Sequence, residues 1–176
     1  FYAIYTFLCM GISAGGLVLS SQYWGAGNIP VVRRVFDMCM QLVLVIGAAF
    51  AALCLLIPER IMRMYINDAD VILEGARYLR ITALIFLPHG LSLVLSQILR
   101  STGNARLGLY TSCISFAVNI GANYVFIFGL GPIPAMGVMG AAVGTLCARL
   151  VEFAVCTCYM LRTERKLCYR FTGILK

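Results

Sequence analysis

The chain has 176 residues, of which 61% are hydrophobic and 12% charged, and its mean hydropathy is +0.91. A soluble globular domain carries roughly 45 to 50% apolar and about 25% charged residues, so the composition excludes an ordinary soluble protein and predicts a chain that lies in lipid. The net charge of +7 comes from basic residues scattered among the segments between apolar runs. This scatter argues against a nucleic-acid partner and points to membrane topology as its cause.

Two long apolar runs open the chain, and each ends at a helix breaker. The first predicts a membrane span over residues 1–25, followed by a turn rich in glycine that runs from Gly25 to Pro30. The second predicts a span over residues 38–57, which stops at Pro58 because proline cannot donate to a continuing helix ladder. The mixed charged and apolar segment 59–80 is expected to be an interfacial connector with some helix.

Three further spans follow, since each crossing needs roughly 20 apolar residues. The third covers residues 81–99 and holds Pro88, which removes a backbone hydrogen bond and is expected to kink the helix. The fourth covers 107–128, and a run of Gly and Pro at 129–134 separates it from the fifth, 136–161. The fold is therefore expected to be all-α, a polytopic transmembrane helical bundle of five spans.

Lysine and arginine are distributed unevenly between alternate loops, which predicts the orientation because cytoplasmic loops carry the excess. One side receives Arg33, Arg34, Arg100, Arg106, Arg162, Arg165, Lys166, Arg170 and Lys176, and the other only Arg60, Arg63, Arg77 and Arg80. The first side is expected to be cytoplasmic, with residues 162–176 as a cytoplasmic connector. Because Phe1 begins directly in apolar sequence without signal-peptide features, the chain is expected to be part of a longer protein.

Four short motifs carry a family resemblance. They are Ser21-Gln22-Tyr23-Trp24-Gly25-Ala26-Gly27-Asn28, Leu99-Arg100-Ser101-Thr102-Gly103-Asn104-Ala105-Arg106, Asn119-Ile120-Gly121-Ala122-Asn123-Tyr124 and Gly137-Val138-Met139-Gly140-Ala141-Ala142-Val143-Gly144-Thr145. In this order and spacing they resemble transporters of the MATE (multidrug and toxic compound extrusion) family. The resemblance implies that the spans are family helices 2 to 6, so that residues 1–161 form most of the N-terminal lobe of a two-lobe, pseudo-two-fold transporter. Helix 1 and the C-terminal lobe would be missing.

The resemblance also implies a function. Members of the family export small organic cations and drugs across the plasma (inner) membrane by alternating access, in exchange for Na⁺ or H⁺ and without a cofactor. No enzyme is expected, because the predicted spans hold one Glu and no cluster of histidines. Two alternatives stay open. One is a lipid-linked oligosaccharide or polysaccharide flippase of the same superfamily, which usually needs a basic cavity, and the other is a non-transporting membrane scaffold.

By resemblance, the positions that match the family's N-lobe ion site are Asn119, Asn123 and Thr145. The two asparagines are four residues apart and therefore share one helix face, where amide oxygens could coordinate a hard cation. Asn123 stands where some relatives have Asp, which leaves the charge of the site and the coupling ion open. In the alternative interpretation, both asparagines join neighbouring helices by hydrogen bonds.

The predicted spans also hold one Arg, one Glu and one His. Arg149 and Glu152 are three residues apart and can neutralise each other, either as a functional site or as a structural pair that reaches the inner interface. His89 could carry a proton, although a lone histidine on a helix is more often a packing residue. The eight cysteines include no C-x-x-C pair, so free thiols and no transition-metal site are expected.

Overall fold

The computed structural model describes residues 1–103, 105–130 and 134–163, and over these residues the chain is all-α. The helices are α1 (Tyr2–Gly25), α2 (Ile29–Leu56), α3 (Pro58–Arg63), α4 (Ala69–Ser101), α5 (Ala105–Phe128) and α6 (Val138–Thr163). All of them except the short α3 are long and apolar enough to cross a membrane. Five predicted spans therefore correspond to five helices of the structure. Most of the expected connector 162–176 lies outside the described residues.

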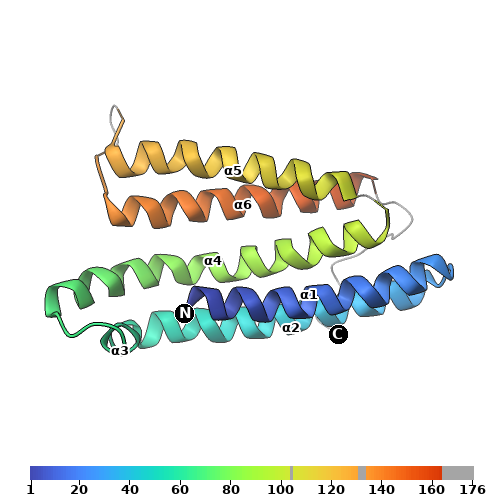
Figure 1. Cartoon of the computed structure of the whole chain (residues 1–176), viewed down its shortest axis with the longest axis horizontal. Helices are drawn as coiled ribbons and strands as arrows, with labels where there is room; N and C mark the ends of the chain where they lie inside the picture. Colours follow the sequence, from blue (N-terminus) through green and yellow to red (C-terminus); the bar gives the residue numbers. More distant parts are fainter. Residues whose placement is uncertain (104, 131–133, 164–176) are drawn as a thin grey trace.

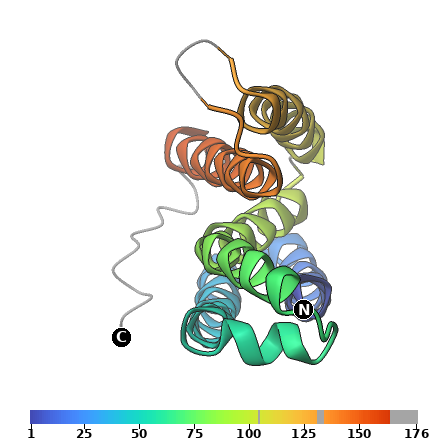
Figure 2. The same ribbon diagram turned by 90° about the vertical axis from the view of Figure 1, so that its left-hand side faces the viewer.

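Helix α4 is the centre of the bundle. Antiparallel α5 and α6 lie on one side of it and the α1–α2 pair on the other (Figures 1 and 2). It packs against each of the other helices. In its most apolar stretch 61% of α4 is buried, compared with 11 to 28% in the other four long helices. Side chains on α4 can therefore reach both halves of the bundle.

Two helices begin well before the spans expected from hydropathy. Helix α2 starts at Ile29 and not at residue 38, with Pro30 in its first turn. Proline is tolerated there because backbone N–H groups in the first turn of a helix have no partner within the helix. Helix α4 starts at Ala69 and not at residue 81, so much of the expected connector is regular helix. Hydropathy marks the part of a helix that suits lipid, whereas charged residues at its ends need not break the backbone ladder.

Local chemistry explains where several helices end. Gly27 has a positive φ of 73° in the turn between α1 and α2, a conformation that glycine adopts without steric cost. Asp68 caps α4, since its carboxylate accepts a hydrogen bond from the amide of Asp70 at 3.0 Å. Gly137 has a φ of 55°, so α6 starts at Val138 and not at residue 136.

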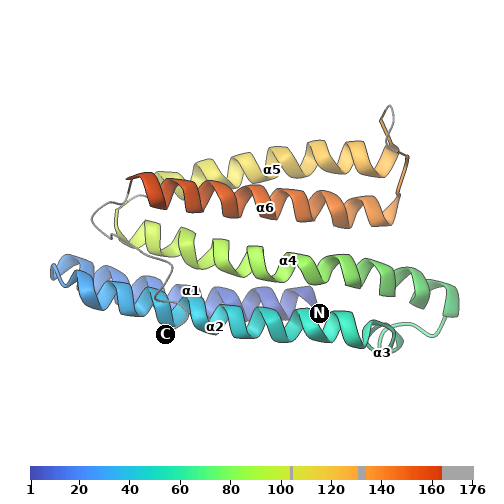
Figure 3. The same ribbon diagram turned by 180° about the vertical axis from the view of Figure 1, so that it is seen from behind.

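The connections alternate between the two ends of the bundle. The α1–α2 turn, the α4–α5 turn and the end of α6 lie at one end, while α3 and the α5–α6 connection lie at the other (Figures 1 and 3). Of the basic residues expected on the cytoplasmic side, those that the structure describes therefore lie at one end of the bundle. The arginines expected on the opposite side lie at the other end. Which end faces the cytoplasm stays a prediction.

The outward faces of the helices are apolar. Large side chains such as Phe7, Val45 and Phe116 are 72%, 69% and 68% exposed. So much exposed apolar surface would be a liability in water but suits lipid. The buried core lies mainly between α1, α2 and α4, where Tyr5, Phe36 and Phe86 are almost completely buried.

A hydrogen bond ties α1 to α4 within this core. The hydroxyl of Tyr5 donates to the backbone carbonyl of Phe86, two residues before Pro88. A Cβ atom on Gly90 would collide with the Tyr5 hydroxyl and with Val43 of α2, so glycine allows the three helices to meet here. Pro88 lies inside α4, which continues as helix on both sides of it. The kink expected at Pro88 stays a prediction.

Tyr5→Phe is expected to lower the free energy of unfolding by about 1 kcal/mol, because it removes one buried hydrogen bond and keeps the aromatic packing. Thermal unfolding of the purified protein in detergent would measure the change. Thr6→Val serves as the control, because the Thr6 hydroxyl bonds only within its own helix, to the carbonyl of Tyr2 at 3.1 Å. An unchanged unfolding midpoint for Tyr5→Phe would show that this hydrogen bond does not stabilise the core.

Candidate functional site

A polar cleft of about 480 Å³ lies between α5 and α6. The residues that line it are Ser112, Ser115, Phe116 and Asn119 of α5 and Thr145, Ala148, Arg149 and Glu152 of α6. Two groups that the sequence placed separately therefore share one site: Asn119 and Thr145 from the expected ion site, and the ion pair. The polar residues recur at helical spacing, which is the sequence signal that could have shown Ser112 and Ser115 to belong with Asn119.

The two asparagines do lie on one face of α5. The amide nitrogen Nδ2 of Asn123 donates to Oδ1 of Asn119 at 3.2 Å. Only Asn119 lines the cleft. Asn123 lies against Gly144 of α6, where an added Cβ atom would be 3.0 Å from the backbone nitrogen of Asn123. The buried Oδ1 of Asn123 has no hydrogen-bond partner. Asn123 therefore packs against α6, the hydrogen bond of the pair stays within α5, and one amide oxygen is left without a donor.

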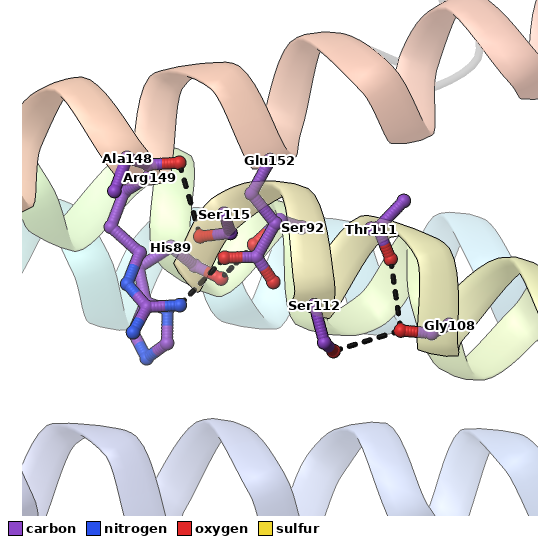
Figure 4. A network of polar contacts seen from close by, with 9 residues as sticks. All are labelled: His89, Ser92, Gly108, Thr111, Ser112, Ser115, Ala148, Arg149 and Glu152. Carbon is purple, nitrogen blue, oxygen red and sulfur yellow. Dashed lines mark hydrogen bonds and ion pairs between the residues drawn. The ribbon is translucent and has the colours of Figure 1, made fainter. Parts of the chain in front are cut away.

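The hydroxyl groups of the cleft donate their protons to backbone carbonyls. Thr145 donates to Ala141 at 2.9 Å and Ser112 to Gly108 at 2.8 Å, each within its own helix. Ser115 of α5 donates to the carbonyl of Ala148 on α6 at 3.3 Å (Figure 4). Since a hydroxyl has one proton and two lone pairs, these oxygens can only accept from, or coordinate, a further group.

Arg149 and Glu152 form the ion pair that their spacing predicts. The guanidinium nitrogen NH1 of Arg149 lies 2.6 Å from Oε2 of Glu152 (Figure 4). The side chain of Arg149 is 31% exposed and that of Glu152 is 12% exposed. Glu152 is the only carboxylate among the residues that line the cleft. A functional role of the pair stays a prediction.

A third element approaches the ion pair from α4. His89 is 4% exposed, and its ring stacks on that of Tyr2 at a centroid distance of 5.5 Å and an interplanar angle of 23°. Neither ring nitrogen of His89, nor the Tyr2 hydroxyl, nor Nε of Arg149 has a hydrogen-bond partner. Arg149 is close enough to act electrostatically on both Tyr2 and His89. Sequence reasoning missed this arrangement, because its members come from three helices.

A second cavity, of about 510 Å³, opens toward the α3 end of the bundle. Its lining is mostly apolar and aromatic and includes Phe1, Tyr65 and Tyr78. Tyr2 and Thr145 also line it, and Thr145 lines the polar cleft as well. Among the described residues, no three His, Cys, Asp or Glu side chains come together as metal ligands.

Comparisons with known proteins agree with this architecture. The family model MatE matches residues 1–125. Probable multidrug resistance protein YoeA of Bacillus subtilis is 26% identical over 158 residues, which are 90% of this chain and 34% of that protein. Probable multidrug resistance protein NorM of Thermotoga maritima is 28% identical, over 86% of this chain and 33% of that protein. The FAD transporter of Shewanella oneidensis is 25% identical, over 91% of this chain and 35% of that protein.

Solved structures show the same fold. An inward-facing multidrug resistance MATE family transporter of the MOP superfamily superposes with a TM-score of 0.80 at 23% identity, over 90% of this chain and 35% of that one. An outward-facing structure with the same description superposes with a TM-score of 0.80 at 22% identity, over 92% and 35%. The chain thus spans about a third of the length of the relatives and structures that it matches.

Proposed function

The chain belongs to the MatE family, and from this premise we propose that it serves the export of small organic cations, including drugs, in exchange for Na⁺ or H⁺. Transport by alternating access needs no covalent chemistry, so no catalytic residue is assigned. The observation that carries the proposal is the polar cleft between α5 and α6 in a bundle whose outer faces are apolar. Polar and ionisable groups are costly inside a membrane and commonly mark a transport pathway.

Three residues are proposed to couple the ion. Asn119 and Thr145 line the cleft, and Asn123 holds Asn119 in place through the hydrogen bond between their amides. Amide and hydroxyl oxygens are ligands for hard cations, and these residues match the family's N-lobe ion site. The aromatic cavity beside Thr145 supports an organic cation as substrate, because aromatic faces attract cations.

The length of the relatives bears on whether a second lobe accompanies this one. Proteins about three times as long as this stretch, named for multidrug resistance, support a second lobe as the partner against which this one moves. The family resemblance implies the plasma (inner) membrane, and the basic residues near the α1–α2 turn, the α4–α5 turn and the end of α6 support a cytoplasmic location for that end. A flippase is less favoured, since the cleft's only arginine is already paired with Glu152.

Ethidium efflux from cells that express the complete protein tests the proposal. We expect the wild-type protein to export the dye. The double variant Asn119→Ala, Asn123→Ala is expected to slow initial efflux at least about tenfold, because it removes ligands of the coupling ion and the groups that orient them. Asn67→Ala, at an exposed position between α3 and α4, is the matched control at equal membrane expression.

Two results would speak against parts of this proposal. If wild type exports none of several cationic dyes, the transport function is wrong and the flippase and scaffold gain. If the double variant pumps like wild type, the asparagines only pack α5 against α6.

A further inference from the structure

Most polar groups of the cleft present oxygen atoms that suit a cation. Its hydroxyl protons are already donated to backbone carbonyls, so Ser112, Ser115 and Thr145 present lone pairs. Glu152 adds a carboxylate that is 12% exposed. A cation that enters the cleft could be surrounded by these oxygens.

One cation already occupies this place. Arg149 neutralises Glu152, which lowers the cost of keeping a carboxylate within the membrane. Yet a single hydrogen bond, from NH1 to Oε2, joins the two side chains, and Nε of Arg149 has no partner. A pair held in this way lacks the second parallel bond that makes arginine–carboxylate pairs strong.

A second resting place for the guanidinium exists on the neighbouring helices. The imidazole nitrogens of His89 on α4 are buried and have no hydrogen-bond partner, and the ring of Tyr2 on α1 stacks on that imidazole. A neutral imidazole offers one nitrogen lone pair, and a phenol oxygen can also accept. Figure 4 shows His89 beside Arg149, so the guanidinium can exchange Glu152 for an acceptor on α4.

From this geometry we propose that Glu152 is the carboxylate of a cation site and that Arg149 is a tethered cation that holds the site until a monovalent cation displaces it. The inference rests on the proposed transport function. Glu152 on α6 then supplies the negative charge that the neutral Asn123 on α5 lacks. When displaced, Arg149 moves toward His89, and this movement links occupancy of the cleft to the contact of α6 with α4.

Binding of radioactive sodium, by equilibrium dialysis, and of ethidium, by fluorescence anisotropy, tests the proposal on the complete protein in detergent. Arg149→Gln removes the competitor and is expected to tighten cation binding about tenfold, a usual size for coupling between two ligands. Glu152→Gln and the double variant with Arg149→Gln are expected to weaken it by at least as much. Arg162→Gln, which removes an exposed charge near the end of the same helix, is the control.

The outcomes separate the site from the function. The arm that responds, sodium or ethidium, identifies the displacing cation. If Arg149→Gln binds both probes no tighter than wild type, or if the double variant binds like wild type, the tethered-cation proposal is overturned while dye export can still be intact. If the binding pattern holds but wild type exports no dye, the site stands and the proposed function fails. The double variant leaves no charge unpaired, so it also controls for misfolding of the single ones.

Discussion

Gly140→Val is expected to separate α5 from α6 and to lower the free energy of unfolding by about 3 kcal/mol, the upper part of the usual range for overpacking. A Cβ atom at Gly140 would lie 2.5 Å from the carbonyl carbon of Phe126 and 2.9 Å from the amide nitrogen of Ile127. These are backbone atoms, which cannot rotate away as the end of a side chain can. The two helices would have to move apart.

The same change should also alter the polar cleft. Because Gly144 lies one turn further along α6 and touches Asn123, a wider spacing would loosen the contact that holds the asparagine pair. Gly121→Val is the matched control, since no atom lies within 4 Å of a Cβ at that position in α5. Thermal unfolding and the monodisperse fraction of the purified protein would measure both variants. Equal unfolding midpoints would show that close approach at Gly140 is not what holds the hairpin together.

Arg149→Leu is expected to lower the free energy of unfolding by about 3 kcal/mol, because it leaves the carboxylate of Glu152, which is 12% exposed, without a counter-charge. The lower end of the range for broken buried pairs applies, since Arg149 is 31% exposed. Arg149→Leu combined with Glu152→Leu should stay within about 1 kcal/mol of wild type, because replacing a whole pair by apolar groups is often neutral. Thermal unfolding in detergent compares the two variants.

Sodium gives this prediction a second readout. If Glu152 binds a cation once Arg149 is gone, added Na⁺ should stabilise Arg149→Leu and leave the double variant unchanged, since a ligand that binds only the native state stabilises it. Stabilisation of both variants by the same amount would indicate a general salt effect. Equal destabilisation of the single and double variants would show that the two charges do not depend on each other.

Several features of the fold were predictable because they depend on short stretches of chain. Hydropathy located the five spans, and the turn residues Gly27 and Pro58 marked helix ends. The hydrogen bond between Asn119 and Asn123 follows from their spacing on one helix. Helices α2 and α4 begin before the predicted spans, because a charged residue limits the apolar stretch without ending the helix.

The candidate site was predictable only in part. The motifs indicated Asn119, Asn123 and Thr145 as ion-site residues, and the spacing of Arg149 and Glu152 predicted their ion pair. Neither signal placed the pair in the same cleft as Asn119, and neither showed that the hydroxyl protons of the cleft are already used.

By itself the sequence determined the membrane class, the number of spans, the family and the contacts between residues one turn apart, since hydropathy and helical periodicity are local properties. The tertiary structure decided which helix faces meet. It made α4 the centre of the bundle, placed Gly140 against the backbone of α5, and brought His89 and Tyr2 beside Arg149. These contacts join residues far apart in the chain, and they depend on how side chains of several helices fill space together, which no single stretch of sequence specifies.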